Sequence, residues 1–144
     1  MSKIEKSVSC FKEGFSCSQA IFSTYGQELG LDKNTALKIS GSFGGGMAGM
    51  AETCGAVTGA FMVIGLKYGK TKPEDEESKR KTYTLVKDFV KRFKAKNSSI
   101  ICKELLGCDI STQEGMKMFK DKNLINTLCP KLVQDVAEIL EEII

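Results

Sequence analysis

The chain of 144 residues contains no histidine and no tryptophan. Histidine is the commonest general base and metal ligand, and it supplies the axial ligand of c-type haem. Its absence excludes Cys-His nucleophilic catalysis and c-type haem attachment. A metal would therefore be held by thiolates, with a carboxylate such as Glu52 as a further ligand. This set favours an iron-sulfur cluster and, less strongly, a four-thiolate zinc site.

Strong charge is also lacking, because 21 basic and 18 acidic residues leave a net charge of +3. That value excludes nucleic acid as an expected ligand. Residues 1–13 lack the apolar core of an export signal, and the longest apolar run, Cys54 to Leu66, is shorter than the roughly 20 residues that span a bilayer. We expect a cytoplasmic protein that is not membrane-embedded. In that reducing compartment, six cysteines favour thiol or metal chemistry over a permanent disulfide framework.

Proline is scarce, and both prolines, Pro73 and Pro130, stand where a helix can begin. No segment shows sustained alternation of apolar and polar residues, which excludes an extensive sheet. The pattern predicts a single all-α domain, residues 1–144, with about eight helices. Three of the predicted helix starts lie in the second half of the chain. Pro73 begins one helix, Ser98 or Ser99 caps a short one, and Ser111 with Glu114 forms a capping box that begins another.

The run from Cys54 to Leu66 is apolar almost all round, which predicts a buried central helix. Gly55 and Gly59, with the alanines that follow each of them, have a small-x-x-x-small spacing. This spacing allows another backbone to approach closely, either within the domain or across a homodimer.

One cysteine is placed at a helix start by a local motif. Ser16 and Gln19 have the spacing of a capping box, so Cys17 is predicted to be the first residue of its helix. Unpaired N–H groups and the positive end of the helix dipole stabilise a thiolate there, and a thiolate attacks disulfides and binds metals.

Two further cysteines are expected in the same setting. Cys129 precedes Pro130, which favours the first helical position, so Cys129 is expected to be the cap. Cys54 lies just before the central helix, with Thr53 or Glu52 as the expected cap.

The glycine-rich stretch before Cys54 contains Gly44, Gly46 and Gly49 in a literal G-x-G-x-x-G. This pattern cradles a dinucleotide when it follows a strand, but here it follows a predicted helix. The alternatives are a tightly bent connection, or a loop whose N–H groups approach sulfur and help to set a potential at Cys54. Four glycines are therefore candidate cofactor contacts: Gly44, Gly45, Gly46 and Gly55.

The spacing of the cysteines is by itself a weak signal, because the chain has no C-x-x-C pair. Any one of the six can equally be a small hydrophobic core residue, and Cys10 is interpreted in that way. Cys102 and Cys108 are close in sequence, but a helix face and a loop end need not bring their thiols together.

Several elements together resemble a known family, and they occur in its order along nearly the whole chain. These are GFSCSQA at 14–20, FGGGM at 43–47, CGAVTG at 54–59, CKELLG at 102–107 and CPKLV at 129–133. The chain is similar to the C_GCAxxG_C_C family of redox-active proteins. The resemblance implies a small, mostly helical protein with four characteristic cysteines, at positions Cys17, Cys54, Cys102 and Cys129 here, and leaves Cys10 and Cys108 outside the pattern.

Two classes of function follow. In the first, the four family cysteines meet in one place and act either in thiol-disulfide exchange, as catalytic residues, or as the ligands of an iron-sulfur cluster or metal. That class requires a redox partner protein, which the sequence does not identify. In the second, the cysteines are inert, and the protein is a binding or assembly module whose glycine-rich helix packs across a homodimer.

Overall fold

The structure, a computed structural model, describes residues 1–144. It contains nine helices and no strand: α1 (Lys3–Lys12), α2 (Cys17–Glu28), α3 (Lys33–Ser40), α4 (Gly55–Tyr68), α5 (Glu76–Asn97), α6 (Cys102–Leu106), α7 (Gln113–Asp121), α8 (Leu124–Thr127) and α9 (Cys129–Ile143). The predicted all-α fold is confirmed. The element that the sequence did not indicate is α8, a single turn that runs directly into α9.

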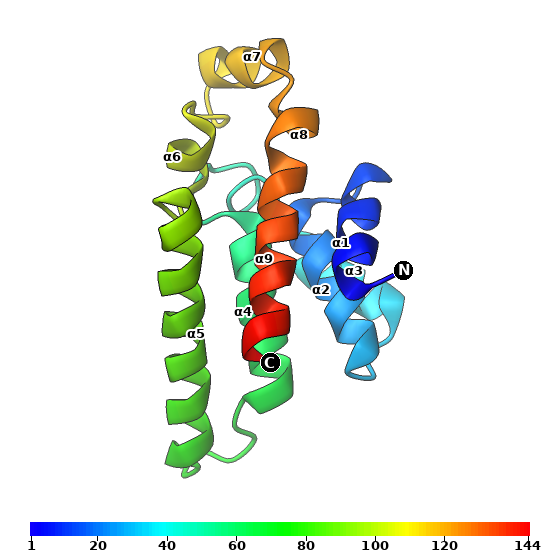
Figure 1. Cartoon of the computed structure of the whole chain (residues 1–144), viewed down its shortest axis with the longest axis vertical. Helices are drawn as coiled ribbons and strands as arrows, with labels where there is room; N and C mark the ends of the chain where they lie inside the picture. The colour runs from blue at the N-terminus through cyan, green and yellow to red at the C-terminus, as the bar shows by residue number, and fades with distance from the viewer.

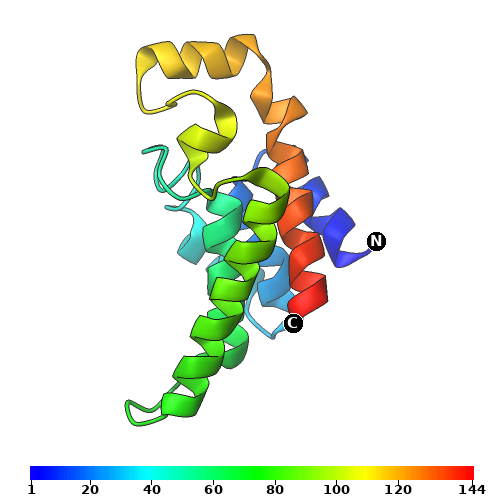
Figure 2. The same cartoon turned by 60° about the vertical axis from the view of Figure 1, so that its left-hand side comes forward.

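Helix α4 lies at the centre, as its apolar sequence predicts. Helices α2, α5 and α9 pack around it, and α1 covers α2 and α9 on the outside (Figure 1). Val57, Val63 and Ile64 of α4 are completely buried because each side of the helix faces a neighbour. The long α5 extends beyond the other helices at the end opposite α7 (Figure 2).

The small-residue spacing of α4 serves contact within the chain. A Cβ atom placed on Gly59 would lie 3.1 Å from the Cβ atom of Ile21 and 3.1 Å from the carbonyl oxygen of Ser18, both in α2. Ala56 and Ala60 are likewise fully buried in the core. Helix α2 therefore occupies the surface of α4 that the sequence also allowed as a homodimer interface.

Two predicted helix starts are shifted. Helix α5 begins at Glu76, three residues after Pro73, because the side chain of Asp75 accepts a hydrogen bond from the backbone N–H of Ser78. Helix α7 is capped by Thr112 rather than Ser111, since the hydroxyl of Ser111 donates to Asp109 instead. The predicted capping box of Ser111 and Glu114 is therefore wrong.

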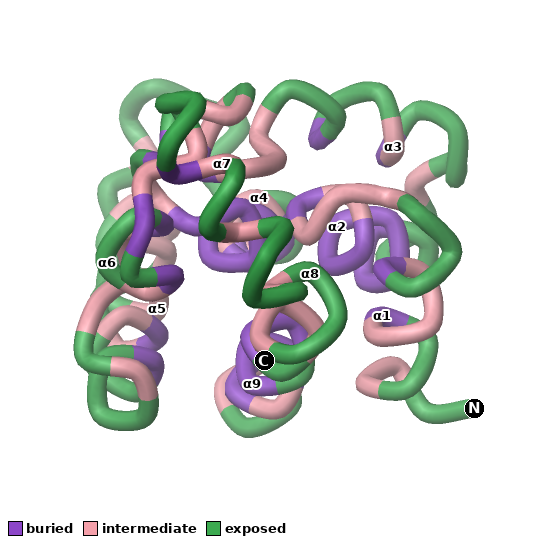
Figure 3. The backbone as a smooth tube through the Cα atoms, turned by 90° about the horizontal axis from the view of Figure 1, so that it is seen from above, coloured by how far each residue is buried: buried purple, intermediate pink, exposed green.

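The segment α6–α8 crosses one end of the bundle. Helix α6 buries Cys102 and Leu106, but the rest of the segment is lightly packed: Gly115 is the only buried residue of α7, and α8 has none (Figure 3). None of the nine helices combines the length and apolar character that a bilayer-spanning helix requires.

Candidate functional site

The glycine-rich stretch between α3 and α4 is a tightly folded loop. Six of its residues adopt positive φ angles: Gly45, Gly46, Met47, Ala48, Gly49 and Ala51. Backbone hydrogen bonds close it on itself, from the N–H of Gly49 to the carbonyl of Gly44 (2.9 Å) and from that of Glu52 to Gly46 (2.9 Å). A Cβ atom on Gly46 would lie only 2.7 Å from the Cβ atom of Cys102, so glycine lets this loop lie against α6.

Backbone pairing joins the end of this loop to the start of α6. The N–H of Cys54 donates to the carbonyl of Ile100 at 2.8 Å, and the N–H of Cys102 donates to Glu52 at 2.6 Å. These bonds flank an isolated antiparallel bridge between Thr53 and Ile101. Cys54 and Cys102, far apart in sequence, are thereby held on neighbouring backbone segments.

Cys17 is the first residue of α2, as predicted. The backbone N–H of Ser16 donates to Oε1 of Gln19 (3.0 Å), and the N–H of Gln19 donates to Oγ of Ser16 (3.3 Å), which completes the capping box. The N-terminus of α2 lies against the start of α4: a Cβ atom placed on Gly55 would be 2.7 Å from the sulfur of Cys17.

The other three family cysteines also lie at helix starts, although the cap predicted for each of these starts is wrong. Cys54 is itself the N-cap of α4, rather than the residue after a cap at Thr53 or Glu52. Cys129 is the first residue of α9, because α8 leads into the helix through Leu128. Cys102 begins α6 after Ile101, which has no capping side chain, so the predicted cap at Ser98 or Ser99 is wrong. Ser98 instead ends α5, and the hydroxyl of Ser99 accepts a hydrogen bond from the N–H of Ile101 at 2.9 Å.

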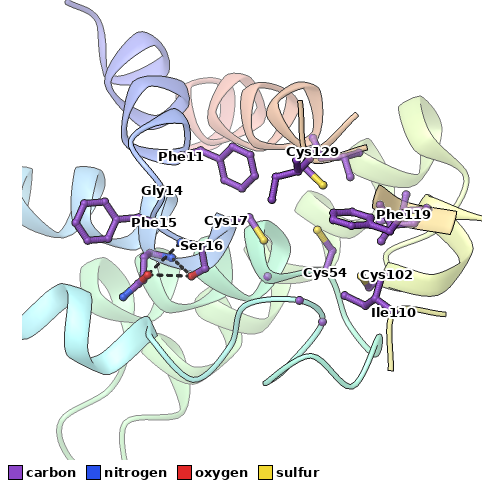
Figure 4. A pocket seen from close by; sticks show the side chains of 18 residues that line it. Phe11, Gly14, Phe15, Ser16, Cys17, Cys54, Cys102, Ile110, Phe119 and Cys129 are labelled. Atoms are coloured by element: carbon purple, nitrogen blue, oxygen red, sulfur yellow. Dashed lines mark hydrogen bonds between the residues drawn. The ribbon is translucent and has the colours of Figure 1, made fainter. Parts of the chain in front are cut away.

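One cavity of about 400 Å³ brings these cysteines together. Its lining includes Cys17, Cys54, Cys102 and Cys129, together with Gly45, Gly46 and Gly55. Figure 4 shows the sulfurs of Cys17, Cys54 and Cys129 around a common space, with Phe11 and Phe119 on opposite sides of it.

Gly44, a predicted cofactor contact, and the two cysteines outside the family pattern do not line this cavity. Gly44 does not line it, and a Cβ atom there would lie 2.6 Å from the Cβ atom of Ser16. Cys108 is buried in a small apolar cluster beside Cys102. Cys10 lies in a separate polar depression, with its sulfur 3.8 Å from the hydroxyl of Ser23.

Cys17 is the acidic thiol of the site. The adjacent Cys54 thiol is the largest influence and, despite burial, lowers the pKa of Cys17 from 9.0 to about 7. Backbone N–H groups of Gly45, Ser18 and Ala56 lower this pKa further. The glycine-rich loop therefore directs an N–H group at Cys17, and not at Cys54 as the sequence had suggested.

The other three thiols are shifted in the opposite direction. Interaction with Cys17 and burial raise the pKa of Cys54 well above its ordinary value. Burial and the charge of Cys17 raise the pKa of Cys102 and of Cys129 to about 12. Cys17 and Cys129 are half-buried, whereas Cys54 and Cys102 are only 5% and 8% exposed. The site thus combines one acidic, half-buried thiol with three weakly acidic ones.

Metal binding does not fit this arrangement as well as thiol chemistry does. No group of three or more cysteine, aspartate or glutamate side chains is close enough to hold one metal ion. The four family thiols line one cavity without forming a ligand set, so we derive no step through zinc or an iron-sulfur cluster.

The comparisons with known proteins agree with the motif order. A family model described as "Putative redox-active protein (C_GCAxxG_C_C)" matches residues 15–143. The chain belongs to the C_GCAxxG_C_C family. The four cysteines that line the cavity all lie within the matched residues, whereas Cys10 precedes them. No curated protein and no solved structure matches the chain significantly.

The close approach of Gly55 to the Cys17 sulfur gives a first prediction. Gly55→Ala would place a methyl group against that sulfur and move it away from its N–H donors, so we expect the pKa of Cys17 to rise. The rate of Cys17 alkylation at neutral pH, measured by mass spectrometry, should fall by about tenfold.

Gly65→Ala is the matched control, because it lies in the same helix and a Cβ atom there would meet nothing within 4 Å. It should leave the alkylation rate unchanged and stabilise the fold by about 0.5–1 kcal/mol. Equal alkylation rates in the two variants would show that Gly55 does not control the position of the Cys17 sulfur.

Proposed function

We propose that this protein carries out thiol-disulfide exchange, with Cys17 as the attacking thiolate and Cys54 as the resolving thiol. The observation that carries the proposal is the contrast within one adjacent pair. The pKa of half-buried Cys17 is lowered to about 7, and that of buried Cys54 is raised. A thiol with a pKa near the ambient pH is the most effective attacking group in disulfide exchange.

The exchange proceeds in two steps. The Cys17 thiolate attacks one sulfur of a substrate disulfide, the substrate S–S bond breaks, and the first half leaves as a thiolate. Formation of the mixed disulfide removes the Cys17 thiolate, the main cause of the raised pKa of Cys54, so Cys54 ionises more readily at this stage. Its thiolate attacks the Cys17 sulfur, and the departing second half takes up the proton that Cys54 released. The substrate gains two electrons as two thiol groups, and the protein loses two as a Cys17–Cys54 disulfide.

Cys102 and Cys129 have a different role in this proposal. Their pKa values of about 12 keep them protonated at neutral pH, so they are poor attacking groups. Their thiols instead contribute uncharged walls beside the reacting pair. A redox partner protein must return two electrons to the oxidised pair in each cycle.

The test starts from protein prepared and reduced without oxygen. After reaction with excess small disulfide, we expect two thiols to be lost per chain, and peptide mapping should place one new bond between Cys17 and Cys54. Bound iron with visible absorption in the anaerobic protein would instead favour a cluster. Six unreactive thiols without metal would favour the binding or assembly alternative, in which the cysteines are structural.

A further inference from the structure

We propose that the disulfide reduced at this site is a small, uncharged and apolar molecule that enters the cavity beside Cys17. This inference rests on the proposed function and adds the class of substrate. It excludes disulfides with charged ends, as well as a folded protein that presents its disulfide from outside.

The lining of the cavity is the first argument. None of its 18 residues is lysine, arginine, aspartate or glutamate, and 12 of them are hydrophobic. The apolar part comes mainly from aromatic and aliphatic side chains: Phe11, Phe15, Leu105, Ile110, Phe119 and Leu132. A charged substrate would lose its hydration in this space, where the only charged group is the Cys17 thiolate, and that charge is lost when the mixed disulfide forms.

The few polar side chains in the lining are already engaged. Ser16 and Gln19 bind each other in the capping box of α2, and Nε2 of Gln19 also donates to the carbonyl of Leu37 at 3.1 Å. These two side chains therefore have few hydrogen bonds left to make with an ammonium or carboxylate group of a substrate. The N–H groups nearest the reacting pair act on the Cys17 sulfur itself.

The size of the cavity limits what can enter. Its volume of about 400 Å³ is at the lower end of the roughly 300–1,000 Å³ typical of small-molecule pockets. This space accommodates a compact organic disulfide, whereas a folded domain is far larger. Buried Cys54, which has to resolve the mixed disulfide, lies in the same lining as Cys17.

Ile125 lies at the edge of the cavity, where a substitution can change the lining without disturbing the core. It lines the cavity but is 49% exposed, and it belongs to α8, which has no buried residue. Ile39 in α3 is the matched control, because it is 48% exposed and does not line the cavity.

The experiment compares three disulfides of similar length in single-turnover reactions with the reduced full chain. Dipropyl disulfide is uncharged, cystamine carries two positive charges, and dithiodiglycolate carries two negative charges. Each rate is divided by the rate of the same disulfide with a free thiol in solution, which removes differences in intrinsic reactivity. We expect the normalised rate for dipropyl disulfide to exceed both others by at least about tenfold.

The variants test whether the cavity itself makes this selection. Ile125→Lys places a cation at the edge of the cavity. We expect it to reduce the normalised rate for dipropyl disulfide by about tenfold and to raise the ratio of the dithiodiglycolate rate to the dipropyl disulfide rate. Ile39→Lys adds the same charge elsewhere and should change neither value. Thermal unfolding of both variants checks that each is folded.

The outcomes separate this inference from the proposed function. If none of the three disulfides, nor insulin as a protein disulfide, oxidises Cys17 faster than solution chemistry predicts, the proposed function fails. If all three small disulfides react at similar normalised rates, or insulin reacts faster than dipropyl disulfide, exchange stands and the small apolar substrate is wrong. Identical behaviour of Ile125→Lys and Ile39→Lys would also overturn the inference.

Discussion

Replacing Cys17 with serine should lower the rate of disulfide exchange by about three orders of magnitude or more. A serine hydroxyl is not ionised at neutral pH, and burial still raises the pKa values of the remaining cavity thiols when the Cys17 thiolate is absent. The rate is measured as loss of a small disulfide under single-turnover conditions. Thiol count and circular dichroism confirm that the variant is folded and reduced.

Cys10→Ser is the matched control for this substitution. Cys10 lies outside the cavity, and its pKa is raised by burial, so it has no part in the proposed exchange. We expect this variant to keep the rate of the unchanged protein. A similar loss of rate in both variants, or no loss in Cys17→Ser, would show that another thiol attacks.

The second large effect is the selective alkylation of Cys17 in the native protein. Near neutral pH, about half of Cys17 is thiolate, whereas a thiol of pKa about 12 is ionised to about one part in 10⁵. A thiolate of lower pKa is intrinsically less nucleophilic, and this partly offsets the difference in ionisation. We therefore expect Cys17 to be alkylated about two to three orders of magnitude faster than a thiol of pKa about 12. Quantitative mass spectrometry after brief treatment with iodoacetamide measures this preference.

The pH dependence of the same reaction follows from the direction of the shift. The pKa of Cys17 is lowered, so its alkylation rate should rise about tenfold per pH unit in acid and level off above about pH 7. The rates at Cys102 and Cys129 should still be rising at pH 9, because their pKa values are raised. A Cys17 profile that rises up to pH 9 would mean that the N–H groups around it do not stabilise its thiolate.

The part of this site that sequence predicts well is local. The capping box of Ser16 and Gln19 involves residues three apart, so the pattern alone places Cys17 at a helix start. The apolar run after Cys54 likewise predicts a buried central helix, because it has no polar face to expose.

The meeting of the four cysteines could not be derived in this way. Cys54 and Cys102 are brought together by backbone hydrogen bonds from their own N–H groups, which every residue except proline can make and which leave no pattern in the sequence. Local helix-start signals indicate Cys17, Cys54 and Cys129, and the resemblance to the family adds Cys102 to them. The role of the glycine-rich loop also depends on tertiary contact, because the N–H group of Gly45 lowers the pKa of Cys17, which lies in helix α2.

The most direct test of the central claim, that Cys17 attacks and Cys54 resolves, is the reaction of Cys54→Ser with a small disulfide. Without the resolving thiol, the first step should stop at a mixed disulfide. We expect intact mass to show one retained substrate half per chain and peptide mapping to place it on Cys17. An adduct mainly on Cys102, Cys129 or another cysteine, or complete turnover without Cys54, would contradict the account.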